Sequence, residues 1–176
     1  SRSALPPMKR VLHLPARDWI GPALVLAGFV LRLRQYIANR SLWLDEAMIS
    51  VNIINRSFTG LTHWLDYDQQ APIGFLWLQK VFVLALGDNE FVLRFLPFLA
   101  GCAALWLMYK ITRRFSPISG NTALALFVVS STLIYYTSES KQYILDVTVA
   151  LGLLLLFLHL DGHGLRLRDH LLLGAV

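Results

Sequence analysis

Two adjacent acids, Asp45 and Glu46, follow the first apolar block of the chain, in the sequence SLWLDEA at residues 41–47. Carboxylates placed just outside a membrane span suit a general base or a metal ligand. Burial near lipid headgroups and a second carboxylate would each raise a carboxyl pKa. A solvated acidic loop, or a helix N-terminus where the dipole favours acids, accounts for the same pattern. The spacing alone leaves these alternatives open.

A second polar cluster, YYTSESKQY, occupies residues 135–143 and is followed by Asp146. If a helix begins near Glu139, then Glu139, Tyr143 and Asp146 lie on one helix face. Asp146 would then lie about two turns inside a membrane span. An ionisable residue there is a candidate functional residue, unless a partner such as Lys141 neutralises it. Lys141 itself suits a phosphate contact, as a compact point charge, or a position at the membrane interface.

The polar residues between these clusters allow both functional and structural interpretations. Glu90 and Arg94 are spaced i,i+4, which predicts a local ion pair on a helix. Four polar residues that precede Pro72 suit contacts to sugar or acceptor hydroxyls, or a polar loop: Asp66, Asp68, Gln69 and Gln70. The chain has no zinc-ligand spacing, glycine-rich phosphate loop or nucleophile elbow, so the sequence predicts no metal site.

The elements that must position these residues are membrane helices. The chain is 56% hydrophobic and 15% charged, whereas soluble domains carry about 25% charged residues. Its apolar residues form blocks near the length of about 20 residues that a membrane span needs. We expect an all-α polytopic membrane protein with spans at about 18–37, 90–109, 119–137 and 142–160, and the start of a fifth at 170–176. We also expect this chain to be a piece of a longer protein. Arg32 and Arg34 should reach from the end of the first span toward the interface.

The course of residues 71–87, another apolar segment, decides the topology. It is short for a span and carries Gln79 and Lys80 in its middle. Lys and Arg in short loops mark the cytoplasmic side. With the basic residues 1–17 inside, a crossing here would put the basic loop at 110–114 outside, whereas a course along the outer interface puts it inside. We therefore expect residues 72–86 to lie along the outer interface.

This topology predicts an integral protein of the plasma or inner membrane, with residues 1–17 cytoplasmic and the membrane domain at 18–176. An extracytoplasmic loop at 38–88 would contain interfacial helices. Both polar clusters then face the same aqueous side. No basic patch on a soluble fold is visible, so we expect no nucleic-acid partner. The single cysteine, Cys102, cannot form an internal disulfide.

The motifs taken together resemble the GT-C superfamily of polyprenyl-phosphate-sugar-dependent glycosyltransferases, and within it the protein O-mannosyltransferases and the lipid A aminoarabinose transferases. The resemblance rests on LWLDEA at 42–47, DQQAP at 68–72, NEFVLRFLP at 89–97 and YTSESKQY at 136–143, and it extends over about 31–160. Each motif alone is loose, but their order and spacing together are specific. Gln142 stands where many members carry proline, and family members have more spans than this chain contains.

The resemblance implies roles for particular residues. Asp45, with Glu46 beside it, corresponds to the candidate catalytic base in the first outer loop of the family. The stretch with Glu139, Lys141 and Tyr143 corresponds to a segment near the donor phosphate. Further candidate contacts to the donor phosphate or substrate are Arg94, Asp68 and Gln70. The resemblance fixes no cofactor and leaves a divalent metal open.

On this resemblance we expect a glycosyltransferase that moves a sugar from a polyprenyl-phosphate carrier to an acceptor hydroxyl. The reaction would take place on the extracytoplasmic face, with inversion at the anomeric carbon. The expected partners are the lipid-linked sugar and membrane lipids. The alternative is a non-catalytic membrane subunit that packs in a larger membrane complex. Several further spans in a full-length sequence would favour the enzyme.

Overall fold

The computed structural model describes residues 19–161, with side chains for 19–160. Its helices are α1 (Ile20–Ile37), α2 (Leu44–Asn55), α3 (Ile73–Leu86), α4 (Glu90–Thr112), α5 (Pro117–Val129), α6 (Ser131–Tyr136) and α7 (Tyr143–Asp161), with two 3-10 turns, η1 (Gly60–Thr62) and η2 (Asp66–Asp68). No β-strand occurs within 19–161, which confirms the all-α prediction for this part of the chain. The predicted cytoplasmic segment 1–17 and the fifth span lie outside the described residues.

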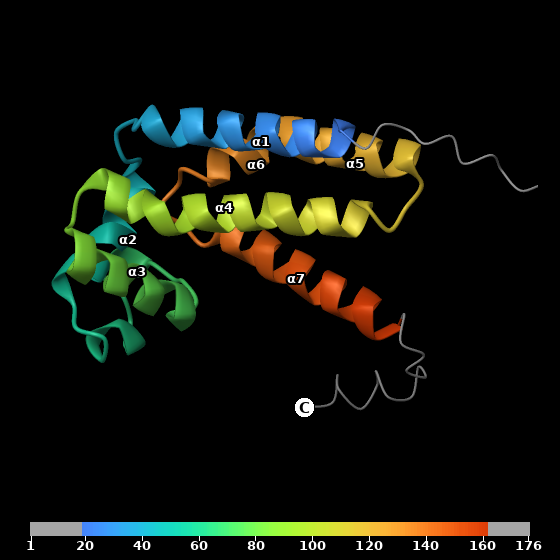
Figure 1. Ribbon diagram of the computed structural model, residues 1–176. Coiled ribbons are helices and arrows are strands. Elements are labelled where there is room, and N and C mark those ends of the chain that lie inside the picture. Colours follow the sequence, from blue (N-terminus) through green and yellow to red (C-terminus); the bar gives the residue numbers. More distant parts are fainter. Residues whose placement is uncertain (1–18, 162–176) are drawn as a thin grey trace, which may run out of the picture.

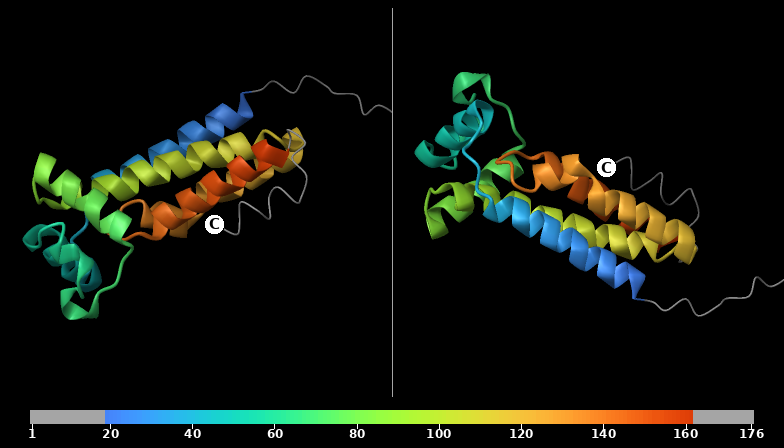
Figure 2. Two further views of the ribbon diagram at one scale, coloured as in Figure 1. Left: turned by 90° about the horizontal axis from the view of Figure 1, so that it is seen from below. Right: turned by 90° about the horizontal axis from the view of Figure 1, so that it is seen from above.

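The helices form a bundle with a cap at one end. Helices α1, α4, α5 and α7 lie along the bundle, whereas α2, α3 and the two 3-10 turns gather at one of its ends (Figures 1 and 2). We call residues 38–88 the cap. Helix α4 lies at the centre and contacts α1, α3, α5 and α7. The chain enters the cap from α1 and leaves it through α4, so the loop between these helices is the body of the cap.

Within residues 19–161, three helices are long and apolar enough to cross a membrane: α1, α4 and α7. The segment predicted as a further span at 119–137 is instead divided into α5 and α6 at Ser130, whose backbone is extended (φ −60°, ψ 108°). The sequence around the break is Val-Val-Ser-Ser-Thr, and Ser and Thr side chains compete with helical backbone hydrogen bonds. Helix α5 therefore spans only about 20 Å, although α6 continues beside α1.

Helix α3 buries its two polar residues beside Phe75, Leu76 and Val83, and its outer surface is apolar. Gln79 is fully buried and its amide donates to the carbonyl oxygens of Val92 (3.4 Å) and Leu93 (2.6 Å). Lys80 is 7% exposed and donates to the carbonyl oxygen of Ile54 at 2.8 Å. The outward residues are Ile73, Trp77, Leu78, Val81, Leu84 and Leu86. The two polar residues that made this segment a poor span thus join α3 to the core of the cap.

Arg32 does not reach toward the interface, as the sequence predicted, but is fully buried within the bundle. Its Nη1 donates to the carbonyl oxygen of Gly28 at 3.1 Å, and its guanidinium lies 5.5 Å from the ring centroid of Phe127 on α5. Arg34, two positions later, is exposed. Helical rotation therefore separates the two arginines, because residues two apart point to different faces.

Close packing of α5 against the end of α4 predicts the effect of one substitution. A Cβ added at Gly120 would lie 2.4 Å from the carbonyl oxygen of Thr112, and backbone cannot move aside as a flexible side chain can. We expect Gly120→Ala to lower the free energy of unfolding by about 1–3 kcal/mol, measured by thermal unfolding in detergent. Gly152→Ala is the control, since nothing lies within 4 Å of its added Cβ. Equal midpoints for both variants would contradict this packing.

Candidate active site

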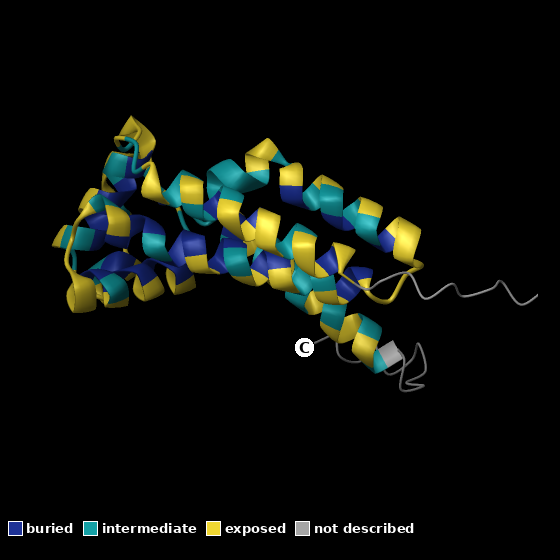
Figure 3. Cartoon of the chain, turned by 45° about the horizontal axis from the view of Figure 1, so that its top comes forward, coloured by how far each residue is buried: buried dark blue, intermediate teal, exposed yellow. Residues whose placement is uncertain are grey.

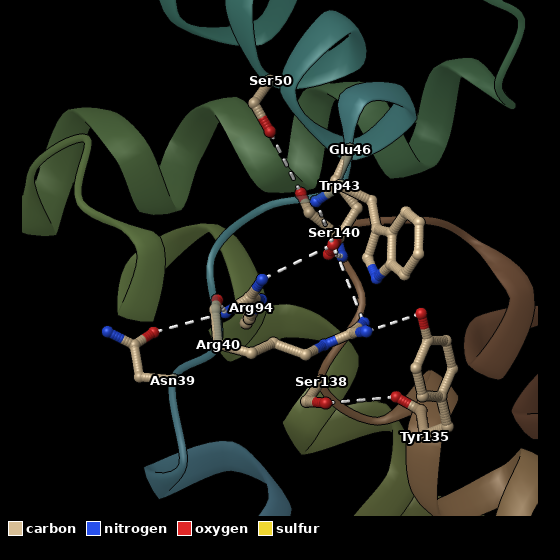
Figure 4. Close-up of polar contacts among 9 residues, drawn as sticks. All are labelled: Asn39, Arg40, Trp43, Glu46, Ser50, Arg94, Tyr135, Ser138 and Ser140. Atoms are coloured by element: carbon tan, nitrogen blue, oxygen red, sulfur yellow. Dashed lines mark hydrogen bonds and ion pairs between the residues drawn. The ribbon is translucent and has the colours of Figure 1, made fainter.

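The candidate site lies where the cap meets the bundle, and the carboxylate of Glu46 is at its centre (Figure 4). Glu46 is fully buried in the first turn of α2. Its Oε1 accepts the backbone N–H of Ser140 at 2.7 Å, and its Oε2 accepts the backbone N–H of Trp43 at 3.1 Å. Because Trp43 is the N-cap of α2, the same carboxylate closes the start of this helix and holds the loop that precedes α7.

Two arginines compensate the buried charge of Glu46. The Nη2 of Arg94 lies 3.4 Å from Oε2, and the Nη2 of Arg40 lies 3.7 Å from the same atom. Arg94 is 1% exposed, and its Nη1 also donates to Asn39 Oδ1 and to the carbonyl oxygen of Arg40. Arg94 therefore pairs with Glu46 rather than with Glu90, which the i,i+4 spacing predicted. Its hydrogen bonds thus join α4 to the 39–46 turn.

Arg40 lies on the more open side of this cluster. Its guanidinium is 4.0 Å from the ring centroid of Tyr135, and its Nη1 donates to the Tyr135 hydroxyl at 2.6 Å. Its side chain is 26% exposed. Its Nε and Nη2 make no hydrogen bond to the described residues. Both nitrogens are buried and Nη2 lies 3.7 Å from Glu46 Oε2, so an anion would contact them only after the side chain moves.

Asp45 points away from the buried cluster and pairs with Lys141. Asp45 Oδ1 lies 2.9 Å from Lys141 Nζ. The side chain of Asp45 is 57% exposed and that of Lys141 is 6% exposed. Lys141 Nζ also donates to Gln69 Oε1 at 2.8 Å. An ammonium group has three donors, so these two contacts leave one. An exposed carboxylate beside a buried ammonium can accept a proton from a bound molecule while the ammonium faces an anion.

Glu139 lies in the loop between α6 and α7, since α7 begins at Tyr143, close to the start of the span expected at 142–160. The alternative of a helix that begins near Glu139 is not observed. Burial raises the pKa of the Glu139 carboxyl, and Glu46 and Asp45 raise it further, while Arg40 and Lys141 lower it. Its Oε2 is buried and makes no hydrogen bond to the described residues. Burial thus favours the protonated form of Glu139, which could donate a hydrogen bond.

The other predicted site residues lie around this cluster. The ring of Tyr143 packs against that of Tyr136 at 4.9 Å between centroids, and the side chain of Asp146 is exposed in the first turn of α7, not two turns inside the span. No hydrogen bond or ion pair joins Asp68 to the described residues of the cluster. Gln70 lines a hollow of about 730 Å³ on the cap, together with Gln69, His63, Trp64, Leu65 and Trp77.

Two residues of the site, Arg40 and Ser140, were not predicted from the sequence as site residues. Arg40 comes directly before the SLWLDEA segment and could have been selected as a basic residue beside the paired acids. Gln69 was predicted to contact hydroxyls or to lie in a polar loop, and its contact with Lys141 has no sequence signal. Ser140 takes part through its backbone N–H and through a hydroxyl 3.4 Å from that of Ser50. No sequence signal identifies such a backbone donor.

Within residues 19–161, no three His, Cys, Asp or Glu side chains come together as a metal site. Comparison with known proteins gives one positive result. Residues 70–176 match the family described as dolichyl-phosphate-mannose-protein mannosyltransferases. The chain belongs to this family of GT-C type glycosyltransferases. No curated protein and no solved structure matches the chain.

Membership of this mannosyltransferase family agrees with the resemblance in the motifs. The matched residues contain Gln70, Arg94, Glu139, Lys141 and Tyr143. Asp45 and Glu46 precede the matched range, but each of them is bonded to the 140–141 segment inside it. The contacts thus connect the acidic pair to the part of the chain that matches the family.

Arg94→Ala should destabilise the protein strongly, because it leaves a buried carboxylate without its closest cation. Removing one partner of a buried ion pair lowers the free energy of unfolding by about 3–5 kcal/mol, which unfolding in detergent would measure. Arg34→Ala, at an exposed arginine of α1, should change it by less than about 1 kcal/mol. In the Glu46→Gln background, the effect of Arg94→Ala should shrink. An undiminished effect would mean that Arg94 does not stabilise the protein through Glu46.

The raised pKa of Glu139 predicts a pH-dependent effect of its substitution. The folded state binds the Glu139 proton more tightly than the unfolded state, so ionisation destabilises the fold as the pH rises through the raised pKa. Glu139→Gln should therefore become more stable relative to wild type as the pH is raised above the ordinary carboxyl range, in thermal unfolding. Gln142→Ala changes no titratable group and should give a constant difference. A constant difference for Glu139→Gln as well would contradict the raised pKa.

Proposed function

We propose that this chain carries the catalytic base and the donor-phosphate contacts of an inverting glycosyltransferase that uses a polyprenyl-phosphate-linked sugar. The observation that carries the proposal is the Asp45–Lys141 pair, in which an exposed carboxylate lies 2.9 Å from a buried ammonium. The family supports a sugar donor on a lipid phosphate. Such a reaction needs a group that accepts the acceptor proton and a cation beside the leaving phosphate.

The arrangement of charges favours placing the cap on the extracytoplasmic side. Among residues 19–160, the acids lie in the cap, at the start of α4, in the 137–142 loop or in the first turn of α7. Lys110, Arg113 and Arg114 lie at the opposite end of the bundle, where α4 ends (Figure 1). Basic residues mark the cytoplasmic side. With this orientation, α3 lies along the outer interface with its apolar face toward lipid, and α5 and α6 together form a broken span.

Asp45 is the base in this proposal, and Glu46 is its support. Glu46 is fully buried and both its oxygens are already hydrogen-bonded, so it cannot reach an acceptor. Asp45 follows Trp43 by two positions on the rigid first turn of α2, and its carboxylate faces outward. Glu46 therefore fixes the turn from which Asp45 acts.

Lys141 and Arg40 are the cations that we assign to the donor phosphate. Lys141 retains one donor after its contacts with Asp45 and Gln69. The side chain of Arg40 is 26% exposed, and its Nε and Nη2, which are buried, are hydrogen-bonded to no described residue. Arg94 is 1% exposed and both its terminal nitrogens are engaged, with Glu46, Asn39 and the Arg40 carbonyl, although its buried Nε also makes no hydrogen bond to the described residues. We therefore assign it to the support of the site and not to the phosphate.

The acceptor would approach from the hollow on the cap. Gln69 lines that hollow and also accepts the hydrogen bond of Lys141, so one side chain connects the hollow to the catalytic pair. The hollow has a volume of about 730 Å³ and its rim carries Trp64 and Trp77, which are 87% and 44% exposed. A concave site of this size with aromatic walls and a few polar groups is typical of ligand pockets.

The reaction is a single displacement at the anomeric carbon. The acceptor oxygen forms a bond to this carbon while Asp45 takes the hydroxyl proton. The bond between the anomeric carbon and the phosphate oxygen breaks, and its electron pair leaves with the polyprenyl phosphate. Lys141 and Arg40 stabilise the charge that develops on that oxygen, which is commonly a large contribution to catalysis.

Asp45→Asn should lower sugar transfer by about 10²–10⁴-fold, because general-base catalysis contributes roughly this factor. The measurement uses membranes that contain the full-length protein and radiolabelled polyprenyl-phosphate mannose, with transfer to membrane acceptors as the readout. Asp88→Asn removes an exposed acid of the same end of the molecule and should transfer at the wild-type rate. Wild-type transfer by Asp45→Asn would remove Asp45 from the mechanism.

Lys141→Met should weaken retention of the same donor by the purified protein, whereas Asp45→Asn should leave donor retention largely intact. The reason is that Lys141 contacts the phosphate and Asp45 contacts the acceptor. Equal donor retention by wild type and Lys141→Met would contradict the assignment of Lys141.

A further inference from the structure

A second hollow lies at the end of the bundle opposite to the cap, between α4 and α7. Its volume is about 630 Å³, and its lining includes Trp106, Lys110, Arg114, Gly152, Leu156 and His159. Helix α7 diverges from α4 toward this end, as Figure 1 shows. The hollow shares no residue with the candidate active site, so the inference drawn from it does not rest on the proposed function.

The rim of this hollow is basic. Lys110 is in the last turn of α4, and its Nζ lies 5.0 Å from the ring centroid of Trp106. Arg114 follows the end of α4, and its Nη1 donates to the carbonyl oxygen of Leu158 at 2.7 Å. His159 lies on the facing side, near the end of α7. Asp161, the last residue of α7, is the one acid of residues 19–161 at this end of the bundle, whereas Lys110, Arg113 and Arg114 are basic. The described residues at this end therefore carry more positive than negative charge.

The wall below the rim is apolar and open to the outside. Gly152 and His159 are seven positions apart on α7, which places Gly152 about 10 Å deeper along the bundle. Between them α7 exposes Leu153, Leu156 and Phe157, and the burial pattern of this helix, with hardly any buried residue along it, can be followed in Figure 3. Trp106 is half-exposed on α4. Charge at the rim and apolar surface below it is the pattern that a phospholipid complements.

We propose that this hollow is a binding site for an anionic phospholipid, with the headgroup phosphate at Lys110 and Arg114 and an acyl chain against Leu156 and Gly152. Basic pockets between membrane helices select anionic headgroups over zwitterionic ones because each cation adds to the attraction. The acyl chain covers leucine surface of α7 that the bundle leaves exposed. The site holds one lipid against both α4 and α7, the two helices that diverge here.

Two variants test the two halves of this site. The full chain, purified in a mild detergent, is mixed with equal amounts of dioleoyl phosphatidylglycerol and dioleoyl phosphatidylcholine, and the retained lipid is measured by native mass spectrometry. Lys110→Gln removes one rim charge and should lower phosphatidylglycerol retention about fivefold. Gly152→Leu keeps every charge but fills the hollow, since nothing lies within 4 Å of a Cβ added there. It should lower retention to a similar extent.

Arg34→Gln is the matched control, because it removes an exposed arginine from the last turn of α1, at the end of the bundle that carries the cap. It should retain phosphatidylglycerol as wild type does. Thermal unfolding of each variant tests whether the fold is kept. Gly152→Leu should keep it, because leucine favours helix more than glycine does. Equal retention of both lipids by wild type, or unchanged retention in Gly152→Leu, would overturn the proposal. A loss in Gly152→Leu without one in Lys110→Gln would overturn its anionic selectivity, as a protein segment or a neutral lipid would then fill the hollow.

Discussion

The candidate site depends on the need to satisfy one buried carboxylate. Glu46 has no exposed surface, and a buried charge without partners is strongly destabilising. Its oxygens therefore hold the N-cap of α2, the backbone of Ser140 and two arginines in fixed positions. Asp45, which precedes Glu46, and Lys141, which follows Ser140, come together as a result. The chemistry is carried by the neighbours of the buried residues rather than by the buried residues themselves.

The cap is joined to the bundle through polar residues turned inward on an otherwise apolar helix. Gln79 and Lys80 satisfy backbone carbonyls of α4 and α2, while the remaining surface of α3 stays apolar. This arrangement fixes the cap on α4 and leaves a hydrophobic exterior that can lie against lipid. Helix α4 also supports the 39–46 turn, because it carries Arg94.

Much of this structure follows from local sequence, and the rest from contacts that sequence does not contain. The long apolar blocks predicted α1, α4 and α7 to within a few residues, since length and hydrophobicity determine such helices. The break at Ser130 was missed because hydropathy is insensitive to a backbone kink. Arg94 was assigned to Glu90 because helical spacing considers only one helix, whereas its partner is 48 residues away. The topology placed Asp45 and Lys141 on one aqueous side, and the family resemblance placed both in one site. The backbone donor of Ser140 has no sequence pattern.

The contact between Glu46 and Ser140 has a consequence for biosynthesis. The two residues are separated by 94 positions, and α3 to α6 are translated between them. A ribosome-bound chain thus carries the finished cap for most of this interval without the amide that its central acid requires. Until the segment before α7 leaves the ribosome, the Glu46 carboxylate must remain hydrated or accept a hydrogen bond from another donor. Completion of the site is therefore tied to the arrival of the last described helix, not to the folding of the cap.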